Sequence, residues 1–246
     1  MSEKYSIEKV FSNEKIEEGM YKLTIKGKFD VKPGQFYLLR AWDIEPILSR
    51  PISIHDKDDD SISFLYNVVG KGTQLLAKLK KEDEIKITGP LGNGFQVDKL
   101  KGKVALVAGG IGIAPMLLLA KQLKKEDTDL FVGFRKNSKI VDNVEKYVNN
   151  LYLSTENGEK GHKGYVTDIL KPENYDVVVC CGPEIMMSKV IKMCEKVGVT
   201  SYVSMENRMA CGIGACLVCT CKTKDGRKRT CNEGPVFLGE ELILND

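Results

Sequence analysis

The first third of the chain alternates hydrophobic and polar residues over short stretches. Residues 21–25, 61–66 and 84–87 each repeat with a period of two, which turns one side of a strand toward a core and the other toward water. Turn-forming residues separate these stretches, as at 32–34. Many short strands joined by regular turns predict a small antiparallel β-barrel, and we expect it to occupy residues 1–100.

The pattern changes near residue 103, where continuous apolar runs replace the alternation. Such runs are typical of parallel strands that are buried on both faces. Because helical stretches separate them, residues 101–204 are predicted to form a parallel α/β domain. The strands are expected at residues 104–108, 130–134, 151–153, 177–180 and 201–205, and the helices at 116–123 and 184–197.

The end of the chain, residues 205–246, is predicted to form a third, small lobe. Residues 217–223 and 227–231 flank a Lys-Asp-Gly sequence at 224–226, and Asp-Gly between alternating strands indicates a hairpin. This hairpin would bring Cys231 back toward the cysteines that precede it. A lobe of about forty residues cannot bury a large core, so we expect a metal to hold it together.

Composition narrows the classes of function. Hydrophobic residues make up 42% of the chain and charged residues 29%, as in an ordinary soluble protein. The net charge of +3 is too small to indicate binding to nucleic acid or to a membrane surface. No apolar run reaches transmembrane length, and the first residues lack the apolar segment of a signal peptide. We therefore expect a cytoplasmic protein with reduced thiols.

Four cysteines in the last lobe have the spacing of an iron–sulfur site. Cys211, Cys216 and Cys219 form C-x4-C-x2-C, and Cys231 follows after eleven residues. This is the plant-type spacing of the ligands of a [2Fe–2S] cluster. The small residues between the cysteines let the backbone curl around sulfur, and the apolar pair at 217–218 is expected to keep part of the surroundings dry.

Zinc and uncoordinated thiols remain alternatives at this motif. Zinc also binds four cysteines, but its sites usually pair two well-separated C-x2–4-C knuckles, whereas here three cysteines share one loop. Cys221 is expected to pack within a strand and to face away from Cys219. Cys180, Cys181 and Cys194 are expected to be buried as small hydrophobic residues.

Two motifs in the barrel region could bind phosphate. The first is Arg-Pro-Ile-Ser at residues 50–53, which offers the planar guanidinium of Arg50 and a hydroxyl. The second, Gly-Lys-Gly-Thr at 70–73, is expected to lie directly before a helix at 74–79, whose first N–H groups could face a pyrophosphate. Each motif is weak alone, because Arg50 could be a surface arginine and Thr73 an ordinary helix N-cap.

A glycine-rich loop follows the first buried strand of the α/β region. Strand, glycine loop and helix in this order are typical of dinucleotide binding, although the loop reads GGxGxAP and not GxGxxG, and a tight packing turn is the alternative. Arg135 and Lys136 stand where an acidic residue would mark NADH, so the choice between NADH and NADPH stays open. The candidate contacts are Gly109, Gly110, Gly112, Pro115, Gly182 and Pro183.

The chemistry of electron transfer links the three predicted sites. Nicotinamide gives up two electrons together as a hydride, an iron–sulfur cluster carries one electron at a time, and a flavin converts between the two. A chain with a nicotinamide site and a cluster therefore needs a flavin, for which the barrel motifs supply a candidate site. Together the parts predict an electron relay.

Taken in order, these motifs resemble those of a known family. RPIS, GKGT, GPLGNGF, GGIGIAP and CGP are similar to the motifs of the ferredoxin reductase superfamily. The C-terminal stretch ENRMACGIGACLVC…C…GPVF closely resembles one branch, the electron-transfer subunits of NAD-dependent (type B) dihydroorotate dehydrogenases. The resemblance covers nearly the whole chain.

The resemblance implies FAD, a [2Fe–2S] cluster and NAD as cofactors. Asn67 departs from the family, whose members often carry a basic residue there, and this puts that flavin contact in doubt. No nucleophile or general base is expected in this chain, because dihydroorotate would be oxidised in a separate subunit. The implied cluster ligands are Cys211, Cys216, Cys219 and Cys231, and the implied FAD contacts are Arg50, Pro51, Ile52, Ser53, Leu65, Tyr66, Asn67, Gly72 and Thr73.

The family also implies a partner, an FMN-containing catalytic subunit, in a heterotetramer of two catalytic and two electron-transfer subunits. Electrons would leave dihydroorotate through FMN and cross the cluster and FAD to NAD, as part of pyrimidine biosynthesis. One alternative is the small flavin and iron–sulfur subunit of another NAD(P)H-linked reductase complex, such as a transhydrogenase-like or sulfide dehydrogenase-like one. Another is a zinc-stapled binding module with no enzymatic role.

Overall fold

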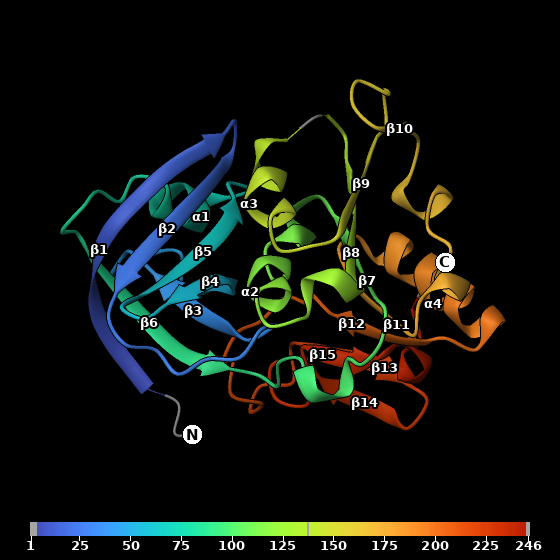
Figure 1. The fold of residues 1–246 in the computed structure, drawn as a ribbon. Helices are drawn as coiled ribbons and strands as arrows, with labels where there is room; N and C mark the ends of the chain where they lie inside the picture. Colours follow the sequence, from blue (N-terminus) through green and yellow to red (C-terminus); the bar gives the residue numbers. More distant parts are fainter. Residues whose placement is uncertain (1–3, 137, 245–246) are drawn as a thin grey trace.

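The computed structural model describes residues 4–136 and 138–244, and its first part is a closed barrel. Six antiparallel strands close the barrel in the order β1-β2-β5-β4-β3-β6 (Figure 1). One short helix, α1, lies between β5 and β6. The elements are β1 (Lys4–Glu17), β2 (Met20–Lys26), β3 (Phe36–Arg40), β4 (Arg50–Asp58), β5 (Ser61–Asn67), α1 (Lys71–Leu76) and β6 (Glu84–Leu91).

Alternation along the strands explains the core of the barrel. Leu23 and Ile25, two residues apart on β2, are fully buried, as are Ile54, Phe64 and Ile85 on the strands around them. A period of two places such residues on one face of each strand, and closure of the sheet brings these faces together. The prediction of an antiparallel barrel is therefore confirmed.

The Gly-Lys-Gly-Thr motif lies inside α1 and not before it. Gly70 is the N-cap residue, and the Thr73 hydroxyl accepts hydrogen bonds from the backbone N–H groups of Val69 and Gly70 at 2.9 and 3.1 Å. The predicted start of the helix at residue 74 was thus wrong, as was the alternative of Thr73 as the N-cap. Thr73 braces the cap from the first turn, so its hydroxyl satisfies two backbone donors.

The second part of the chain is a seven-stranded sheet in the order β10-β9-β8-β7-β11-β12-β15. The first six strands run parallel, as predicted, and helices cover both faces (Figure 1). The elements are β7 (Val104–Gly109), α2 (Met116–Ala120), β8 (Thr128–Phe134), α3 (Asp142–Glu145), β9 (Asn150–Thr155), β10 (His162–Lys163), β11 (Val177–Cys181), α4 (Glu184–Val197) and β12 (Thr200–Ser204).

Strand β7 is buried on both faces, which accounts for its continuous apolar run. Val104, Leu106 and Ala108 belong to the cluster that includes α2 and α3, whereas Ala105 and Val107 belong to the cluster under α4. Alternate residues of one strand thus serve two cores. No helix in the described ranges is long and apolar enough to span a membrane.

The helices of this domain match the sequence to different degrees. Helix α4 has the predicted bounds and ends at Gly198, whose φ of +69° is the left-handed conformation that glycine adopts without steric cost. Helix α2 starts at the predicted residue, Met116, but ends at Ala120 and not at residue 123. Beyond Ala120, the N–H groups of Gln122 and Leu123 bond to carbonyls three residues back and not four, which ends the α-helix as a tighter turn.

The C-terminal segment forms the predicted hairpin and one strand that was not predicted. The hairpin consists of β13 (Thr220–Thr223) and β14 (Gly226–Arg229). Strand β15 (Val236–Leu238) then returns to the large sheet and pairs antiparallel with β12 (Figure 1). The lobe is therefore fastened to the α/β domain at both of its ends.

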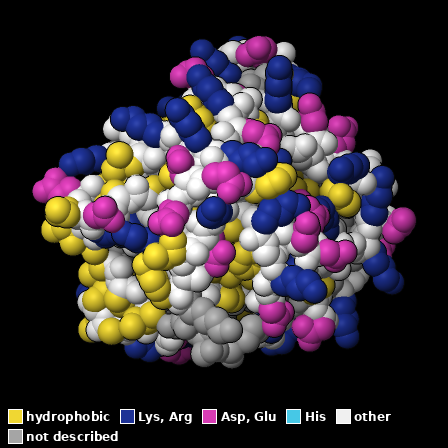
Figure 2. All heavy atoms as spheres, turned by 90° about the vertical axis from the view of Figure 1, so that its left-hand side faces the viewer, with side chains coloured by type: hydrophobic (Ala, Val, Ile, Leu, Met, Phe, Trp, Pro, Cys, Tyr) yellow, Lys and Arg dark blue, Asp and Glu magenta, His cyan; other side chains and the backbone are white. Residues whose placement is uncertain are grey.

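The outer surface of the barrel carries charges of both signs among exposed hydrophobic side chains. Tyr5, Ile7 and Phe11 on β1 are exposed, and Figure 2 shows hydrophobic, basic and acidic side chains interspersed on this side of the molecule. The mixture agrees with the small net charge of +3.

Candidate functional site

A cleft of about 690 Å³ lies where the barrel, the α/β domain and the C-terminal lobe meet. Three segments predicted as flavin contacts line it together, although they come from separate strands and a helix. Its predicted lining residues are Arg50, Pro51, Ile52, Ser53, Leu65, Tyr66, Asn67 and Thr73. Ile111 and Ala114 of the glycine-rich loop complete the wall, together with Met205 to Met209 of the lobe, a contribution that the sequence analysis missed.

Arg50 is held at the edge of the cleft by local contacts. Its guanidinium lies 5.4 Å from the centre of the Trp42 ring and donates hydrogen bonds to the carbonyl of Leu48 and, at 3.4 Å, to that of Ser49. Burial and the neighbouring Arg40 lower its pKa, but an arginine stays protonated in a protein. The Arg50 guanidinium therefore presents a positive charge in a fixed orientation at the wall of the cleft.

Position 72 requires a glycine because the side chain of Arg50 packs directly against it. A Cβ atom at Gly72 would come within 2.4 Å of the Arg50 Nε atom, so any larger residue would displace the guanidinium. Gly72 is not itself in the cleft wall, but it makes room for the residue that is. The two barrel motifs predicted separately from the sequence thus form one structure.

Tyr66 is fixed by hydrogen bonding. Its hydroxyl donates to the side-chain oxygen of Asn13 at 3.1 Å, and the Asn13 amide donates to the carbonyls of Leu76 and Leu79 at 2.9 and 3.0 Å. Burial raises the pKa of Tyr66, so the hydroxyl stays neutral. The ring therefore presents a rigid apolar surface to the cleft.

The two glycine loops of the α/β domain pack directly against each other. A Cβ atom at Gly112 would lie 2.2 Å from the carbonyl oxygen of Cys181, and one at Gly109 would lie 2.7 Å from the ring of Pro183. These glycines allow the loops after β7 and β11 to touch at the carboxyl ends of the strands. Gly110, by contrast, has a φ of +53° and open space around it.

Glu206 is a candidate residue that the sequence analysis missed. The Cys181 thiol donates to its Oε1 atom at 3.8 Å, and the carboxyl opens on the cleft. Desolvation by the surrounding protein raises the pKa of Glu206, and burial raises that of Cys181. The signal available was the position of an acidic residue directly after a predicted strand and before the cysteine motif.

The four cysteines of the predicted cluster motif lie as two pairs. The backbone N–H of Cys216 donates to the Cys211 sulfur at 3.4 Å, and that of Cys231 donates to the Cys219 sulfur at 3.4 Å. The N–H of Gly214 links the pairs by donating to Cys231 at 3.2 Å. The hairpin therefore brings Cys231 back to the loop as predicted.

The local surroundings act differently on the individual thiols. Burial alone would raise the pKa of Cys211, but hydrogen bonds from the backbone of Cys216 and Ile213 help to lower it to about 7. Burial, together with the hydrogen-bonded Cys219 thiol, raises the pKa of Cys231 to about 12. N–H groups directed at sulfur are the usual environment of a thiolate ligand.

The dry side of the motif comes from the barrel. Phe36, Leu38 and Leu91 pack with Met209, Cys219 and Cys231 in one buried cluster. The prediction that the pair at 217–218 would shield the site was wrong in this chain, because both side chains are more than half exposed. The shielding residues are far away in the sequence, so spacing could not reveal them.

The other cysteines behave as predicted. Cys180, Cys181 and Cys194 are buried, and Cys221 packs in the cluster beneath α4, whereas Cys219 packs in the separate cluster against the barrel. Among the described residues, no three His, Cys, Asp or Glu side chains converge closely enough to hold a single metal ion. Two pairs of thiols suit a site with two iron atoms better than a single zinc ion.

Family profiles match two parts of the chain. Residues 206–243 match the iron–sulfur cluster binding domain of dihydroorotate dehydrogenase B, and residues 106–192 match the oxidoreductase NAD-binding domain. The first covers the four cysteines and Glu206, and the second covers both glycine loops. The matches therefore fall on the parts whose geometry is described above.

Solved structures share the fold. The structure of the NADH-dependent reduced ferredoxin-NADP oxidoreductase, an enzyme of flavin-based electron bifurcation, superimposes with a TM-score of 0.86 and 29% identity over 97% of this chain and 90% of that one. A ferredoxin NADP+ reductase from Neisseria gonorrhoeae has a TM-score of 0.63 at 16% identity, over 83% and 94% of the two chains. The fold is that of the ferredoxin reductase-like oxidoreductases. Together with the two family profiles, it supports FAD, NAD and a [2Fe–2S] cluster as the cofactors.

Sequence relatives define the family more closely. The electron transfer subunit of dihydroorotate dehydrogenase B (NAD(+)) from Clostridium acetobutylicum is 71% identical over the full length of both chains. That from Clostridium perfringens is 48% identical over 98% of this chain and 99% of its own. The chain belongs to the family of electron transfer subunits of dihydroorotate dehydrogenase B.

Proposed function

We propose that this chain passes electrons between a dihydroorotate-oxidising subunit and NAD, through a [2Fe–2S] cluster and FAD bound in its cleft. One observation carries the proposal: residues 205–209 line the cleft and lead directly into the loop of Cys211. Ile111 and Ala114 of the NAD loop line the same cleft. Segments next to the proposed NAD and cluster sites thus line the cleft proposed for FAD, which supports an electron relay through the three.

The cleft fits FAD on the strength of its own residues. Arg50 offers a charge-assisted fork for the pyrophosphate, and Gly72 leaves the space that the fork needs. Tyr66 offers a fixed aromatic surface. We assign the contacts to Arg50, Pro51, Ile52, Ser53, Leu65, Tyr66, Asn67 and Thr73, with Gly72 acting through the space that it leaves for Arg50.

The NAD site is proposed at the two packed glycine loops. They lie at the carboxyl ends of β7 and β11, which is where open α/β sheets bind their ligands, and they border the cleft beside Ala114. The contacts that we assign are Gly109, Gly110, Gly112, Pro115, Gly182 and Pro183. Arg135 and Lys136 occupy the place where an acidic residue would mark NADH, so the preference between NADH and NADPH is to be measured by titration with each.

Cys211, Cys216, Cys219 and Cys231 are the proposed cluster ligands. Their arrangement in two pairs would give each iron of a [2Fe–2S] site two thiolates, and the N–H of Gly214 supports one of them. When bound, the flavin supplies the conversion between two-electron and one-electron transfer. The residues of the chain bind these groups, orient them and exclude water, and none serves as a nucleophile or general base.

The partner is proposed to be an FMN-containing catalytic subunit, in a heterotetramer of two plus two that works in pyrimidine biosynthesis in the cytoplasm. Ile213, Leu217 and Val218 on the cluster loop are 50–60% exposed, and an apolar rim around the cysteines suits a protein partner. We also propose that residues 1–100, 101–204 and 205–246 act as the FAD, NAD and cluster units.

A second candidate function is supported by the structural comparison. The match to the NADH-dependent reduced ferredoxin-NADP oxidoreductase covers 97% of this chain, so the same layout occurs in another reductase. The proposed electron relay is tested by an anaerobic NADH titration of the purified chain, which is followed by visible absorption and EPR. Iron, zinc and flavin are counted in the same sample. Bleaching of the flavin together with a reduced [2Fe–2S] signal is expected.

The partner is tested next, by adding a dihydroorotate-oxidising FMN subunit to the reduced or oxidised chain. Dihydroorotate-dependent reduction of NAD supports the proposed function. Transfer to ferredoxin or NADP, without any response to dihydroorotate, would favour the second candidate. Zinc, absent flavin and no response to NADH would identify a non-enzymatic binding module.

A further inference from the structure

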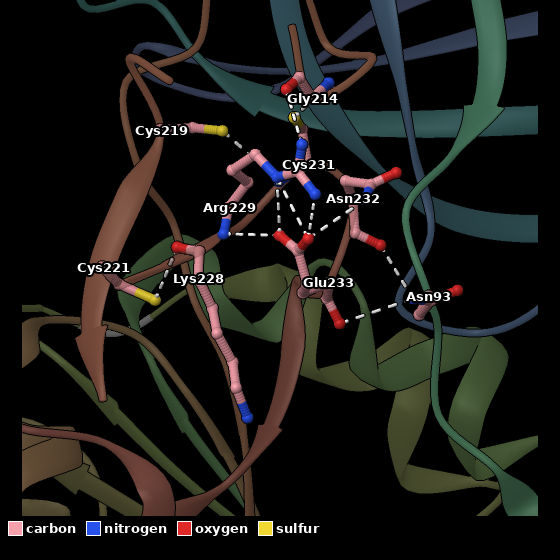
Figure 3. A network of polar contacts seen from close by, with 9 residues as sticks. All are labelled: Asn93, Gly214, Cys219, Cys221, Lys228, Arg229, Cys231, Asn232 and Glu233. Carbon is pink, nitrogen blue, oxygen red and sulfur yellow. Dashed lines mark hydrogen bonds and ion pairs between the residues drawn. The ribbon is translucent and has the colours of Figure 1, made fainter. Parts of the chain in front are cut away.

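A paired arginine and glutamate flank the cysteine loop (Figure 3). The Nε atom of Arg229 donates to both carboxylate oxygens of Glu233 at 3.0 and 2.9 Å, and its Nη2 atom contacts the same carboxylate. The backbone N–H of Arg229 also donates to Glu233, at 2.7 Å. Both side chains are one-third exposed, so their charges lie close to the surface but in one fixed geometry.

Arg229 reaches from this ion pair to the cysteine loop. Its Nη1 atom donates to the carbonyl of Gly214 at 2.8 Å, and the N–H of Gly214 donates to the sulfur of Cys231 at 3.2 Å. A Cβ atom at Gly214 would crowd both Arg229 and Asn232, at 3.1–3.2 Å. Arg229 therefore binds the carbonyl of the same residue whose N–H donates to the Cys231 sulfur, and it holds Gly214 in place beside that sulfur.

The opposite end of the network is anchored to the barrel. The Asn232 amide donates to the Glu233 carboxylate at 3.2 Å, and the side chain of Asn93 donates to the carbonyl of Asn232 at 2.8 Å (Figure 3). Asn93 belongs to the turn after β6. Because both ends are tied down, the two charges cannot move away when the charge of the neighbouring site changes.

We propose that Arg229 and Glu233 are positioning residues that set the reduction potential of the cluster. A positive group near a cluster favours the form that holds the extra electron, and a negative group opposes it. Glu233 offsets most of the charge of Arg229, so the pair keeps the potential lower than an unpaired arginine would. This inference rests on the proposed ligands, which include Cys219 and Cys231.

The test is a mediated redox titration of the full chain with its cofactors, followed by EPR. Glu233→Gln keeps the size of the side chain but removes its charge. We expect the equilibrium constant for reduction to rise about tenfold, which corresponds to about 59 mV for a one-electron couple. Arg229→Gln is expected to shift the potential in the opposite direction, and the double variant is expected to return toward the wild-type value.

Matched controls exist in the same lobe. Glu240→Gln and Arg227→Gln make the same charge changes at exposed positions and should move the potential much less. Arg229→Lys keeps the positive charge but loses the bidentate guanidinium. The reduction potential of this variant should stay unchanged, while a chelator should remove its iron faster. Shifts for Glu233→Gln no larger than that of Glu240→Gln overturn the inference, as does faster iron loss in every variant at an unchanged potential.

Failure of this inference can be told apart from failure of the proposed function. A wild-type chain without a [2Fe–2S] signal, or a Cys219→Ser variant that keeps the signal, overturns the ligand assignment. A normal wild-type signal whose potential ignores both charges overturns only the role of Arg229 and Glu233. If Arg229→Gln does not assemble a cluster, Glu233→Gln and Arg229→Lys still decide the question.

Discussion

His55 is a buried imidazole that joins β4 of the barrel to the glycine-rich loop before α2. Its Nδ1 atom lies 2.8 Å from the carbonyl oxygen of Ala114 and must donate to it, because a carbonyl can only accept. The Nε2 atom is buried and has no hydrogen-bond partner among the described residues. The ring is therefore held neutral between β4 and the loop before α2.

This position predicts a dependence of stability on pH. Burial lowers the pKa of His55 below its ordinary value of 6.5, with Lys22 and Lys121 adding to the effect and the Ala114 bond and Asp56 opposing it. The unfolded chain then binds the proton more readily, so the contribution is present above about pH 6.5 and is lost as the pH falls below it. One proton of difference between the two states limits the slope to at most about 1.4 kcal/mol per pH unit.

The measurement is urea unfolding between pH 5 and pH 8. His55→Gln can still donate to Ala114 but does not titrate, so its free energy of unfolding should fall less steeply below pH 6.5 than that of the wild type. His162→Gln, at the exposed histidine, is the control and should follow the wild type. Equal slopes for His55→Gln and the wild type would remove His55 as the cause.

Arg50 supports a second prediction at this scale. Arg50→Ala removes a charged hydrogen-bond donor, which is worth about 1.5–3 kcal/mol, so FAD should bind about ten- to a hundredfold more weakly. Gly72→Ala should also weaken FAD, because its Cβ would displace the guanidinium. Equilibrium dialysis of FAD checks both, with Arg227→Ala as the control, and unchanged affinity in both variants would contradict the assigned role.

Among the elements, the cluster loop and β13 divide the neighbouring cysteines between two environments. Cys219 packs with the barrel residues Phe36 and Leu38, whereas Cys221 packs beneath α4. Alternation along a strand would place residues two apart on the same face, but Cys219 lies in the turn before β13, so its side chain is free to point toward the barrel. The same residue type therefore has a proposed ligand role at one position and a packing role at the other.

Serine substitutions distinguish these roles. Cys219→Ser is expected to lose the [2Fe–2S] absorption and to weaken assembly with the partner subunit, because the lobe depends on its metal. Cys221→Ser should keep the cluster and cost only the small loss of packing that a buried thiol provides. Iron content and visible spectra of the two variants provide the check. Loss of iron in both to the same extent would contradict the division.

Sequence patterns predicted some elements well because the signals were local. Helix α4 was predicted with its bounds, since its periodicity ends at Gly198, and the Asp-Gly turn predicted the hairpin. Strand β15 was missed because three residues, Val236–Leu238, form a strand only when the edge of β12 is beside them. The dry side of the cysteine motif was missed for a similar reason, since Phe36 and Leu91 are distant in sequence.

At the scale of the whole molecule, polar contacts tie the three parts together. Lys121 of the α/β domain makes an ion pair with Asp56 of the barrel at 2.6 Å, and both side chains are about four-fifths buried. The N–H of Asn93 in the barrel donates to the carbonyl of Gly234 in the lobe at 2.6 Å. A change in the lobe is therefore expected to reach the cleft, which the lobe helps to line.

Removal of iron by a chelator under reducing conditions tests this connection. Amide hydrogen exchange should accelerate first in residues 206–233 and then in β15, while β2 and β5 keep their protection. FAD affinity should fall several-fold, because residues 205–209 line its proposed site. A uniform loss of protection, or unchanged exchange in the lobe, would contradict the expectation.

The return of β15 to the sheet also indicates how the cluster lobe could be removed from the chain. Ser204, where the chain leaves β12, pairs with Val236, where β15 begins, so the entry and exit of the lobe are neighbours. The whole cluster module is thus an enlarged hairpin loop inserted into the nucleotide-binding sheet. A short turn spliced between these two residues should give a chain that keeps its sheet edge and has no cluster, and other redox modules could be grafted at the same junction.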